Sequence, residues 1–316
     1  MLKLKKTNFL KALTVFQTII IFLLVIFIVW FCFIKNSGLA IPASNPEIRT
    51  RPIIEKEETF YQYDGRKIFT HDSTLGETFI PAFADVPAST LNPDNFIKEK
   101  NGFISYNGSE VQKTFTGIDI SEHQGNINWQ AVKNSGIDFA MIRLGYRTYG
   151  GGIITIDSSY AQNIEGAQNA GIDVGVYFYS QAINTNEAIE EADTVLNIIS
   201  NYNITYPIVF DWELIFNDKA RTDSTGVETL ADCCVAFCER IKGAGYTPMI
   251  YQNLSTAVHK LDMPRIKDYE FWLAEYGDKP SFYYEYDMWQ YSSNGTVAGI
   301  SGGVDLNICF KDYSAG

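Results

Sequence analysis

Short hydrophobic runs alternate with segments of mixed polarity from Gly117 to the end of the chain. Nearly continuous apolar runs of this length are typical of strands that are buried on both faces, as in a parallel sheet. The runs that predict strands are Gly117–Ile120, Phe139–Gly145, Val174–Tyr179, Pro207–Glu213, Pro248–Gln252, Phe271–Tyr276, Asp287–Tyr291 and Val304–Ile308.

Between the early runs, hydrophobic residues recur at the three- to four-residue spacing of a helix. The clearest case is Thr225–Ala244, which stops at Gly245, a residue suited to a helix end. After residue 250 the intervals become too short for full helices. The helices expected are Asn128–Asn134, Asp157–Ala170, Asn186–Ser200 and Thr225–Ala244.

This alternation predicts an α/β fold, an irregular (β/α) TIM-like barrel of about eight strands. A doubly wound parallel sheet is the alternative. It is disfavoured because no Gly-rich phosphate loop follows the first predicted strand.

A different pattern occupies the start of the chain, where Ala12–Ile34 is almost wholly apolar. As a helix this segment would be roughly 34 Å long, enough to cross a bilayer. Four lysines precede it and only Lys35 follows closely, which predicts a cytoplasmic N-terminus and an extracellular remainder. The alternative is a secretory signal that is cleaved near Gly38–Ala40. Both interpretations export the chain beyond this segment.

The charge of the chain argues against nucleic acid as a partner. The formal net charge is −12, and beyond residue 35 the chain carries 20 basic and 37 acidic residues. Binding to phosphate requires a basic face. Hydrophobic residues make up 46% of the chain and aromatic residues 14%, so aromatic side chains remain available for a binding cleft after a core is filled.

The cysteines and histidines form no recognisable metal or disulfide pattern. Cys32 lies in the apolar N-terminal segment, while Cys233, Cys234 and Cys238 lie on one predicted helix and Cys309 lies near the C-terminus. Buried free thiols are expected, with a Cys234–Cys309 or Cys238–Cys309 bridge as the alternative. Since the sequence also lacks a His-rich cluster, a CxxC pair and EF-hand spacing, neither a metal ion nor a cofactor is expected.

Asp211 and Glu213 stand two residues apart at the end of Pro207–Glu213. Alternate side chains of a strand share a face, so both acids are expected to point the same way, with Cα atoms roughly 6.6 Å apart. Two carboxyl groups that face one space tend to split their pKa values, which suits acid–base work. Taken alone, the pair also fits a strand that ends in a polar loop.

Further polar and aromatic residues fall at the C-terminal ends of the predicted strands, where barrels of this class place their chemistry. Aromatic faces stack on sugar rings, and paired carboxylates are the groups used in glycoside hydrolysis. His123, after the first strand, is another possible acid–base group. The candidate catalytic residues are Glu213, Asp211, Asp119 and Asp305, and the candidate substrate-binding residues are Tyr177, Tyr179, Arg143, Tyr251, Trp272, Tyr276 and Gln290.

An ordered set of short motifs resembles glycoside hydrolase family 25, the Chalaropsis-type lysozymes. The resemblance covers about residues 115–310, and each piece is weak by itself while the ordered set is specific. The usual aspartate before the tryptophan of the first motif is Asn128 here, at a position expected to be structural. The motifs are Gly117–Gly125 with Ile127–Trp129, Phe139–Arg143, Gly175–Ser180, Asp211–Glu213, Trp272–Tyr276, Trp289–Ser292 and Gly303–Asn307.

The resemblance implies a muramidase that cleaves the β-1,4 bond between N-acetylmuramic acid and N-acetylglucosamine in peptidoglycan. It implies that Glu213 is the general acid/base, Asp211 its partner, and Asp119 and Asp305 the flanking acids. Asp211 would either attack the sugar directly or stabilise attack by the substrate's own 2-acetamido group, and both routes retain the anomeric configuration. A non-catalytic peptidoglycan-binding module and a chitinase-like hydrolase are the alternatives.

The expected organisation therefore has four parts. Residues 1–11 form a cytoplasmic tail, 12–34 a transmembrane anchor, 35–113 an extracellular linker or stem, and 114–316 the family 25-like catalytic domain. The expected partners are peptidoglycan glycan strands and the membrane, through residues 12–34. The stem has no functional interpretation, and the oligomeric state is open.

Overall fold

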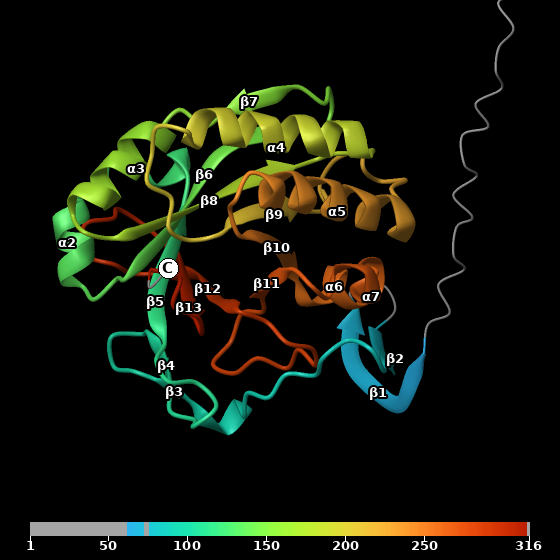
Figure 1. The fold of residues 1–316 in the computed structure, drawn as a ribbon. Coiled ribbons are helices and arrows are strands. Elements are labelled where there is room, and N and C mark those ends of the chain that lie inside the picture. Colours follow the sequence, from blue (N-terminus) through green and yellow to red (C-terminus); the bar gives the residue numbers. More distant parts are fainter. Residues whose placement is uncertain (1–61, 73–75, 315–316) are drawn as a thin grey trace, which may run out of the picture. The chain divides into compact units, whose positions relative to one another are not determined.

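The computed structural model describes residues 62–72 and 76–314, and its main feature is a closed β-barrel (Figure 1). Going round the barrel, the strands follow the order β5, β6, β8, β9, β10, β11, β12 and β13, and β13 pairs back with β5. All neighbouring pairs are parallel except those of β13, which is antiparallel to both β12 and β5. The barrel strands are β5 (Phe115–Ile120), β6 (Phe139–Arg147), β8 (Asp173–Ser180), β9 (Ile208–Trp212), β10 (Pro248–Asn253), β11 (Glu270–Ala274), β12 (Met288–Gly295) and β13 (Val304–Cys309).

The predicted barrel is confirmed, and each predicted strand has a counterpart, with two informative differences at the ends. β9 ends at Trp212, so Glu213 lies one residue beyond the strand rather than in it. β11 ends at Ala274, so Tyr276 belongs to the following loop, and its side chain is 59% exposed. In both cases the ladder ends before the predicted run does: the last pair of β9 with β10 is Asp211 with Tyr251, and the last pair of β11 with β12 is Ala274 with Gln290.

Helices lie outside the barrel against its early strands (Figure 1). The helix predicted from Asp157 begins only at Tyr160. The Asp157 carboxylate accepts hydrogen bonds from Ser159 N and Glu122 N and forms an ion pair with Arg143. These contacts hold Asp157 in the loop before the helix. The helices are α2 (Trp129–Asn134), α3 (Tyr160–Asn169), α4 (Thr185–Ile199), α5 (Val227–Gly243), α6 (Leu254–Lys260) and α7 (Met263–Ile266). The short 3₁₀ turns are η1 (Pro93–Asn95) and η2 (Glu122–Gln124), and β7 (Ile154–Ile156) pairs antiparallel with β6.

The Asn128 side chain caps the start of α2. Its Oδ1 atom accepts a hydrogen bond from Ala131 N at 3.2 Å. An N-cap of this kind satisfies one of the free N–H groups of the first helical turn. The structural role predicted for Asn128 is therefore confirmed.

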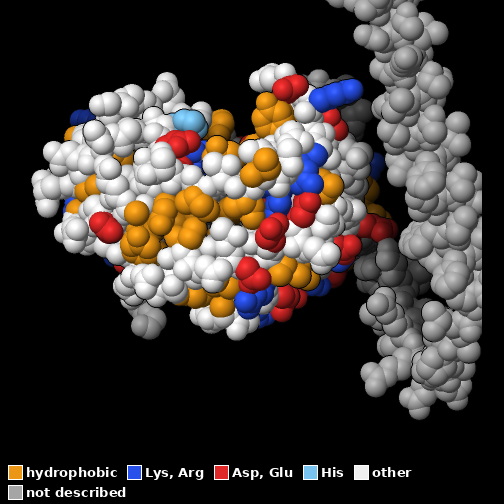
Figure 2. All heavy atoms as spheres, turned by 90° about the horizontal axis from the view of Figure 1, so that it is seen from above, with side chains coloured by type: hydrophobic (Ala, Val, Ile, Leu, Met, Phe, Trp, Pro, Cys, Tyr) orange, Lys and Arg blue, Asp and Glu red, His pale blue; other side chains and the backbone are white. Residues whose placement is uncertain are grey.

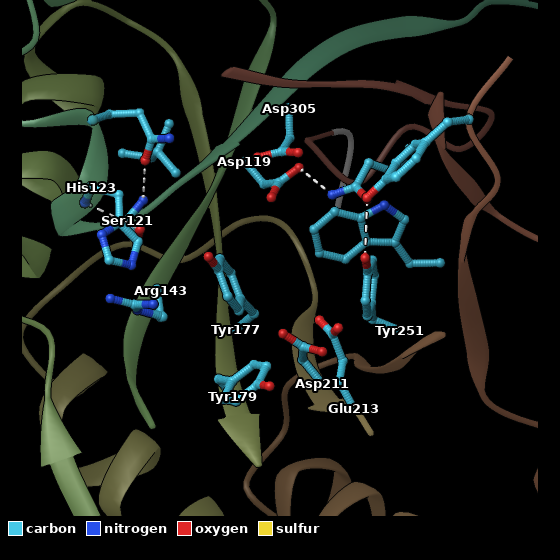
Figure 3. Close-up of a pocket in the computed structure, with 15 residues that line it drawn as sticks. Asp119, Ser121, His123, Arg143, Tyr177, Tyr179, Asp211, Glu213, Tyr251 and Asp305 are labelled. Atoms are coloured by element: carbon cyan, nitrogen blue, oxygen red, sulfur yellow. Dashed lines mark hydrogen bonds between the residues drawn. The ribbon is translucent and has the colours of Figure 1, made fainter. Parts of the chain in front are cut away.

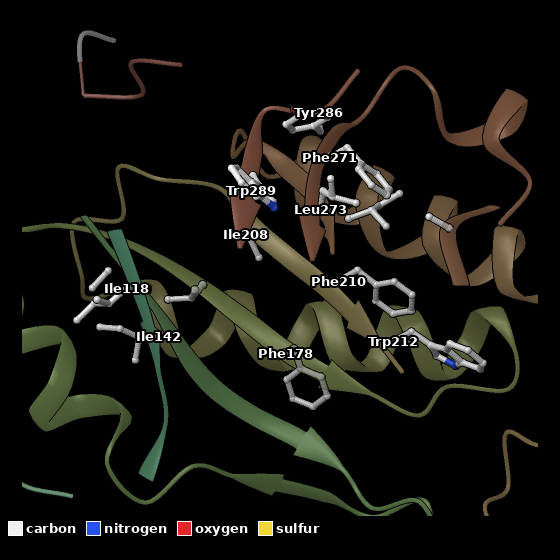
Figure 4. Close-up of a cluster of buried hydrophobic side chains, with 14 of the residues drawn as sticks. Ile118, Ile142, Phe178, Ile208, Phe210, Trp212, Phe271, Leu273, Tyr286 and Trp289 are labelled. Atoms are coloured by element: carbon white, nitrogen blue, oxygen red, sulfur yellow. The ribbon is translucent and has the colours of Figure 1, made fainter. Parts of the chain in front are cut away.

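The strands are apolar on both sides because each side packs against a different layer. On the helix side, Phe178, Phe210 and Trp212 are fully buried, and the Phe210 ring lies 5.1 Å from that of Phe237 on α5 (Figure 4). On the barrel side, the Phe139 ring fills the space beside Gly117, where any Cβ atom would clash with it. Burial of each such large apolar side chain stabilises the fold by about 1.5–3 kcal/mol.

Two small antiparallel hairpins precede the barrel, β1 (Tyr63–Asp72) with β2 (Gly76–Phe83), and β3 (Phe96–Lys98) with β4 (Ile104–Tyr106). Phe96 packs edge-on against Trp289 with ring centroids 5.0 Å apart, and Ile104 N donates to Tyr291 Oη at 3.4 Å. The second hairpin therefore covers the outer side of β12, where the chain offers no long helix.

The helix face of the domain carries mixed charges. Figure 2 shows basic side chains beside acidic ones, together with apolar side chains, over this face. The pair Arg240–Asp193, with an N–O distance of 2.5 Å, links α5 to α4 in this way. Exposed pairs of this kind contribute little to stability, but they keep the surface polar.

The predicted membrane segment 12–34, with the tail 1–11, lies outside the described residues. Within the described part of the chain, no helix is long and apolar enough to cross a membrane. Cys32 also lies outside this part. Cys233, Cys234, Cys238 and Cys309 are buried free thiols, as expected, so neither alternative bridge is formed.

Candidate active site

A polar cavity of about 280 Å³ opens at the C-terminal ends of the barrel strands (Figure 3). All eleven site residues predicted from the sequence line this cavity. The lining residues are Asp119, Ile120, Ser121, His123, Gln124, Arg143, Tyr177, Tyr179, Asp211, Glu213, Tyr251, Trp272, Tyr276, Gln290 and Asp305. They come from every strand of the barrel or the loop directly after it, because the inward positions near the strand ends all face one space.

Asp211 and Glu213 lie side by side in this cavity (Figure 3). Burial raises the pKa of Asp211 well above its usual value, and the charge of Glu213 and a hydrogen bond between the two side chains add to the rise. Burial also raises the pKa of Glu213, against the lowering effect of its hydrogen bond with Asp211. Because two buried carboxylates in contact resist joint ionisation, the pair is expected to retain one proton over a wide pH range.

Asp211 is poorly supplied with hydrogen-bond donors. Its side chain is buried, and its Oδ1 atom has no hydrogen-bond partner within residues 62–72 and 76–314. A buried oxygen without a partner costs free energy unless something else occupies the site. Asp211 therefore has an acceptor available for a donor that enters the cavity.

Asp119 and Asp305 form a second pair on the opposite wall. They lie directly across from each other in the antiparallel ladder of β5 and β13. Burial raises the pKa of Asp305 to about 6, and both burial and the charge of Asp305 raise the pKa of Asp119 well above its usual value. Like charges opposite each other in a ladder are destabilising, so this pair needs compensation.

Two amide groups supply part of that compensation for Asp119. Its Oδ2 atom accepts hydrogen bonds from Gln290 Nε2 at 2.8 Å and from Asn307 Nδ2 at 2.7 Å. Asn307 is not among the site residues predicted from the sequence. The available signal was its position two residues after Asp305, which places it on the same face of β13.

Three of the aromatic residues that line the cavity are held by the same network. Tyr251 Oη and Tyr276 Oη donate to Gln290 Oε1 at 3.0 and 3.1 Å, and Trp272 Nε1 donates to Asn307 Oδ1 at 2.9 Å. Rings held by their polar ends present their faces to the cavity in a defined orientation. The cavity therefore has rigid aromatic walls suited to a sugar ring.

Arg143 and His123 lie on the remaining wall. Arg143 Nε forms an ion pair with Asp157 Oδ2 at 2.8 Å, and Arg143 Nη2 forms one with Glu122 Oε1 at 3.2 Å. The positive charge of Arg143 nevertheless lowers the pKa of Asp211, against the larger effect of burial. The guanidinium group is thus held near the acids rather than free to follow a ligand. Across the described residues, no group of three or more His, Cys, Asp or Glu side chains is arranged to hold a metal ion.

Comparisons with known proteins agree with this geometry. The family model described as glycosyl hydrolases family 25 matches residues 118–300. The autolytic lysozyme of Clostridium acetobutylicum is 33% identical over 192 residues, which are 60% of this chain and 54% of that protein. Lysozyme M1 of Streptomyces globisporus is 30% identical over 206 residues, which are 60% of this chain and 66% of that protein. The chain thus spans about half to two thirds of the length of these curated relatives.

Solved structures give the same result. The modular autolysin LytC from Streptococcus pneumoniae superposes with a TM-score of 0.56 at 27% identity, over 76% of this chain and 56% of that one. LytC has also been solved in complex with a synthetic peptidoglycan ligand. The bacterial lysozyme from Streptomyces coelicolor superposes with a TM-score of 0.52 at 27% identity, over 65% of this chain and 95% of that one.

Proposed function

Because this chain belongs to the glycosyl hydrolases of family 25, we propose that it is a lysozyme-type muramidase acting on peptidoglycan. The bond cleaved would be the β-1,4 link between N-acetylmuramic acid and N-acetylglucosamine. The observation that carries the proposal is the adjacent pair Asp211 and Glu213 in a cavity with fixed aromatic walls. The lysozymes among its relatives, and the peptidoglycan ligand bound to LytC, support this choice of substrate.

In the proposed mechanism, Glu213 is the general acid and then the general base. Burial raises the pKa of Glu213 above that of an ordinary glutamate, although its hydrogen bond with Asp211 acts in the opposite direction. In this mechanism Glu213 carries the proton of the pair when the reaction begins. It donates its proton to the glycosidic oxygen as the bond breaks, and the resulting carboxylate then accepts a proton from the attacking water. Rate is therefore expected to fall as the pH rises through the pKa of Glu213.

Asp211 has one of two roles, and we favour the second. It either attacks the anomeric carbon itself, or orients and stabilises the substrate's 2-acetamido group, whose carbonyl oxygen attacks instead. The second role fits two acids that stand side by side on one chain segment rather than on opposite faces of a sugar. It also fits the unpartnered Oδ1 of Asp211, which would accept the acetamido N–H. Both routes retain the anomeric configuration, so inversion in the first-formed product would contradict both.

We also propose that residues 12–34 anchor the enzyme in the membrane with the barrel outside the cell. The support is the apolar sequence of this segment and the lysines before it. The prediction is that cell fractionation recovers the full-length chain with the membrane. Recovery of the protein in the medium without residues 1–40 would indicate cleavage of a signal instead.

The decisive experiment is digestion of purified cell wall by the full chain and two variants. Glu213→Gln keeps the size and shape of the side chain but cannot act as a carboxylic acid that donates its proton, so the rate should fall by about 10³-fold or more. Glu165→Gln, a change at an exposed glutamate of α3, is the matched control and should leave the rate unchanged. Reducing ends are identified to establish which bond is cut.

Each alternative has its own outcome in this experiment. A wall-binding module would retain peptidoglycan without releasing any reducing ends, in the wild type as in Glu213→Gln. A chitinase-like hydrolase would release products from chitin oligomers in preference to wall. Full activity of Glu213→Gln on wall would contradict the role assigned to Glu213.

A further inference from the structure

Glu213 is a carboxylate that the sheet itself does not hold. The ladder between β9 and β8 ends at the pair Trp212 and Ser180, and the ladder between β9 and β10 ends at the pair Asp211 and Tyr251. Glu213 therefore lies past the last strand pairing on both sides. Catalytic groups must be held within about 0.5 Å of their working position, so another support is needed.

Two buried glutamines provide that support, one from each neighbouring strand. Gln181, directly after β8, donates from Nε2 to Glu213 O at 2.7 Å. Gln252, within β10, donates from Nε2 to Trp212 O. Both side chains are at most 1% exposed, and neither lines the active-site cavity. The two amides thus extend the sheet's hydrogen bonding by one residue, using side chains in place of strands.

This arrangement fixes the backbone of Glu213 in both of its rotatable dihedrals. The carbonyl of Trp212 belongs to the peptide unit before the Glu213 Cα atom, and the carbonyl of Glu213 belongs to the unit after it. Since φ and ψ are the only soft backbone dihedrals of a residue, holding both adjacent peptide planes leaves little freedom at this Cα atom. The direction of its Cα–Cβ bond is then set as well.

Gln181 is itself held from a third direction. Its Oε1 atom accepts a hydrogen bond from Thr222 Oγ1 at 2.7 Å, and its backbone carbonyl accepts one from Arg221 Nη1 at 3.0 Å. Arg221 is in turn fixed by two hydrogen bonds to the Glu187 carboxylate on α4, at 2.6 and 2.7 Å. The amide is thus tied to the loop after β9 and, through Arg221, to α4.

From this geometry we infer that Gln181 and Gln252 are positioning residues for the acid/base, which aim the Glu213 side chain at the reacting bond. The inference rests on the proposed muramidase function. It also explains why Gln252 is a glutamine. Its Oε1 atom is buried without a hydrogen-bond partner within the described residues, a cost that an apolar side chain would avoid if stability alone mattered.

The test uses Gln181→Met and Gln252→Met, which keep side-chain length and remove the amide donor. On a soluble glycan substrate each should lower kcat by about 10- to 100-fold, because small displacements of a catalytic group have effects of this size. KM should stay within about twofold, because neither side chain contacts substrate. Asn163→Leu is the control, since Asn163 is a buried amide on α3 whose side chain has no hydrogen bond within the described residues, and kcat should not change.

A second measurement separates aiming from a general loss of structure. In a Glu213→Gln background, each Met variant should leave the residual rate unchanged, because the group it aims is already disabled. If a double variant has a lower kcat than Glu213→Gln alone, by the same factor as in the single Met variant, the inference is overturned. An unchanged kcat in the folded single Met variants would also overturn it. In both cases the proposed muramidase function would stand. An inactive wild type would instead contradict the proposed function.

If Gln181→Met does not fold, Thr222→Val replaces it in the test. This variant removes the hydroxyl that holds Gln181 Oε1 and leaves Gln181 in place. We expect kcat to fall by about threefold at constant KM, a smaller loss of the same kind as in Gln181→Met and Gln252→Met. An unchanged kcat in Thr222→Val would then count against the role of Gln181.

Discussion

The cavity contains two pairs of acids that differ in how they are held. Asp119 and Asp305 face each other across a strand ladder, and Asp119 accepts two short hydrogen bonds from amides. Asp211 and Glu213 are adjacent on one chain segment, and Asp211 has an oxygen with no partner in the described part of the chain. Asp119 is already satisfied by the protein, whereas Asp211 still has acceptor capacity to offer to a ligand.

This difference supports the proposal that Asp211 and Glu213 are the reacting pair and Asp119 and Asp305 the supporting one. Burial raises the pKa in both pairs, so a raised pKa alone does not identify the catalytic acids. Hydrogen bonds do distinguish the two pairs. The Asp119 carboxylate accepts hydrogen bonds from Gln290 and Asn307 and so fixes these two side chains. They in turn hold aromatic residues of the cavity wall. We expect the chemistry to depend far more on Asp211 and Glu213 than on Asp119 and Asp305.

The largest effect expected from this comparison is a contrast between Asp211→Asn and Asp119→Asn. The first should lower kcat by about 10²- to 10³-fold, because it removes the charge that supports the developing positive charge of the sugar. The second should cost about tenfold, through misplacement of Gln290 and Asn307. Steady-state kinetics on one glycan substrate measure both, and equal losses would show that the two pairs do not differ in this way.

A smaller effect is expected for Asp305→Asn, and its sign follows from the charges. The Asp305 carboxylate raises the pKa of Glu213, so its removal should lower that pKa. The alkaline limb of the kcat–pH profile, where Glu213 loses its proton, should then move to lower pH, by less than about one unit for one partly exposed neighbouring charge. A limb that stays in place or moves to higher pH would show that Asp305 does not act on Glu213 electrostatically.

The same variant should alter the dependence of stability on pH. The pKa of Asp305 rises from 3.8 to about 6 on folding, so its contribution to stability is fully present below about pH 4 and is lost as the pH rises through 6. Asp305→Asn should therefore show a smaller decrease in Tm between pH 4 and pH 7 than the wild type. Thermal unfolding across this range provides the measurement.

The sequence was sufficient to locate most of the site, because most candidates stand near the end of an apolar run and the barrel brings these ends together. Asp119, Tyr251 and Gln290 were found in this way. Asp305 instead stands at the start of its run. Periodicity does not encode strand direction, so the antiparallel course of β13 was not predicted, nor was the pairing of Asp305 with Asp119. It also carries no signal for where a ladder ends, which is why Glu213 was expected inside a strand.

Side chains that act through backbone atoms were the hardest to foresee. Gln181 and Gln252 bind the main-chain carbonyls of Glu213 and Trp212 at the end of β9, and any polar residue of suitable length would look the same in a hydrophobicity pattern. Asn307 escaped notice because it lies in an apolar run and faces the barrel interior. Each of these roles depends on which strands are neighbours, and this becomes known only once the barrel is closed.

The closing strand β13 has a consequence for the order of events in the cell. It pairs with β5, the first barrel strand, and it supplies Asp305 to the cavity and the Asn307 amide that holds Asp119. During synthesis this pairing has to wait until Val304–Cys309 have left the ribosome, long after the segment with Asp211 and Glu213 has emerged. Until then, the nascent chain contains Asp211 and Glu213 but lacks the strand that completes the cavity around them. The proposed activity is therefore expected only once Val304–Cys309 have emerged and paired with β5, when the barrel can close.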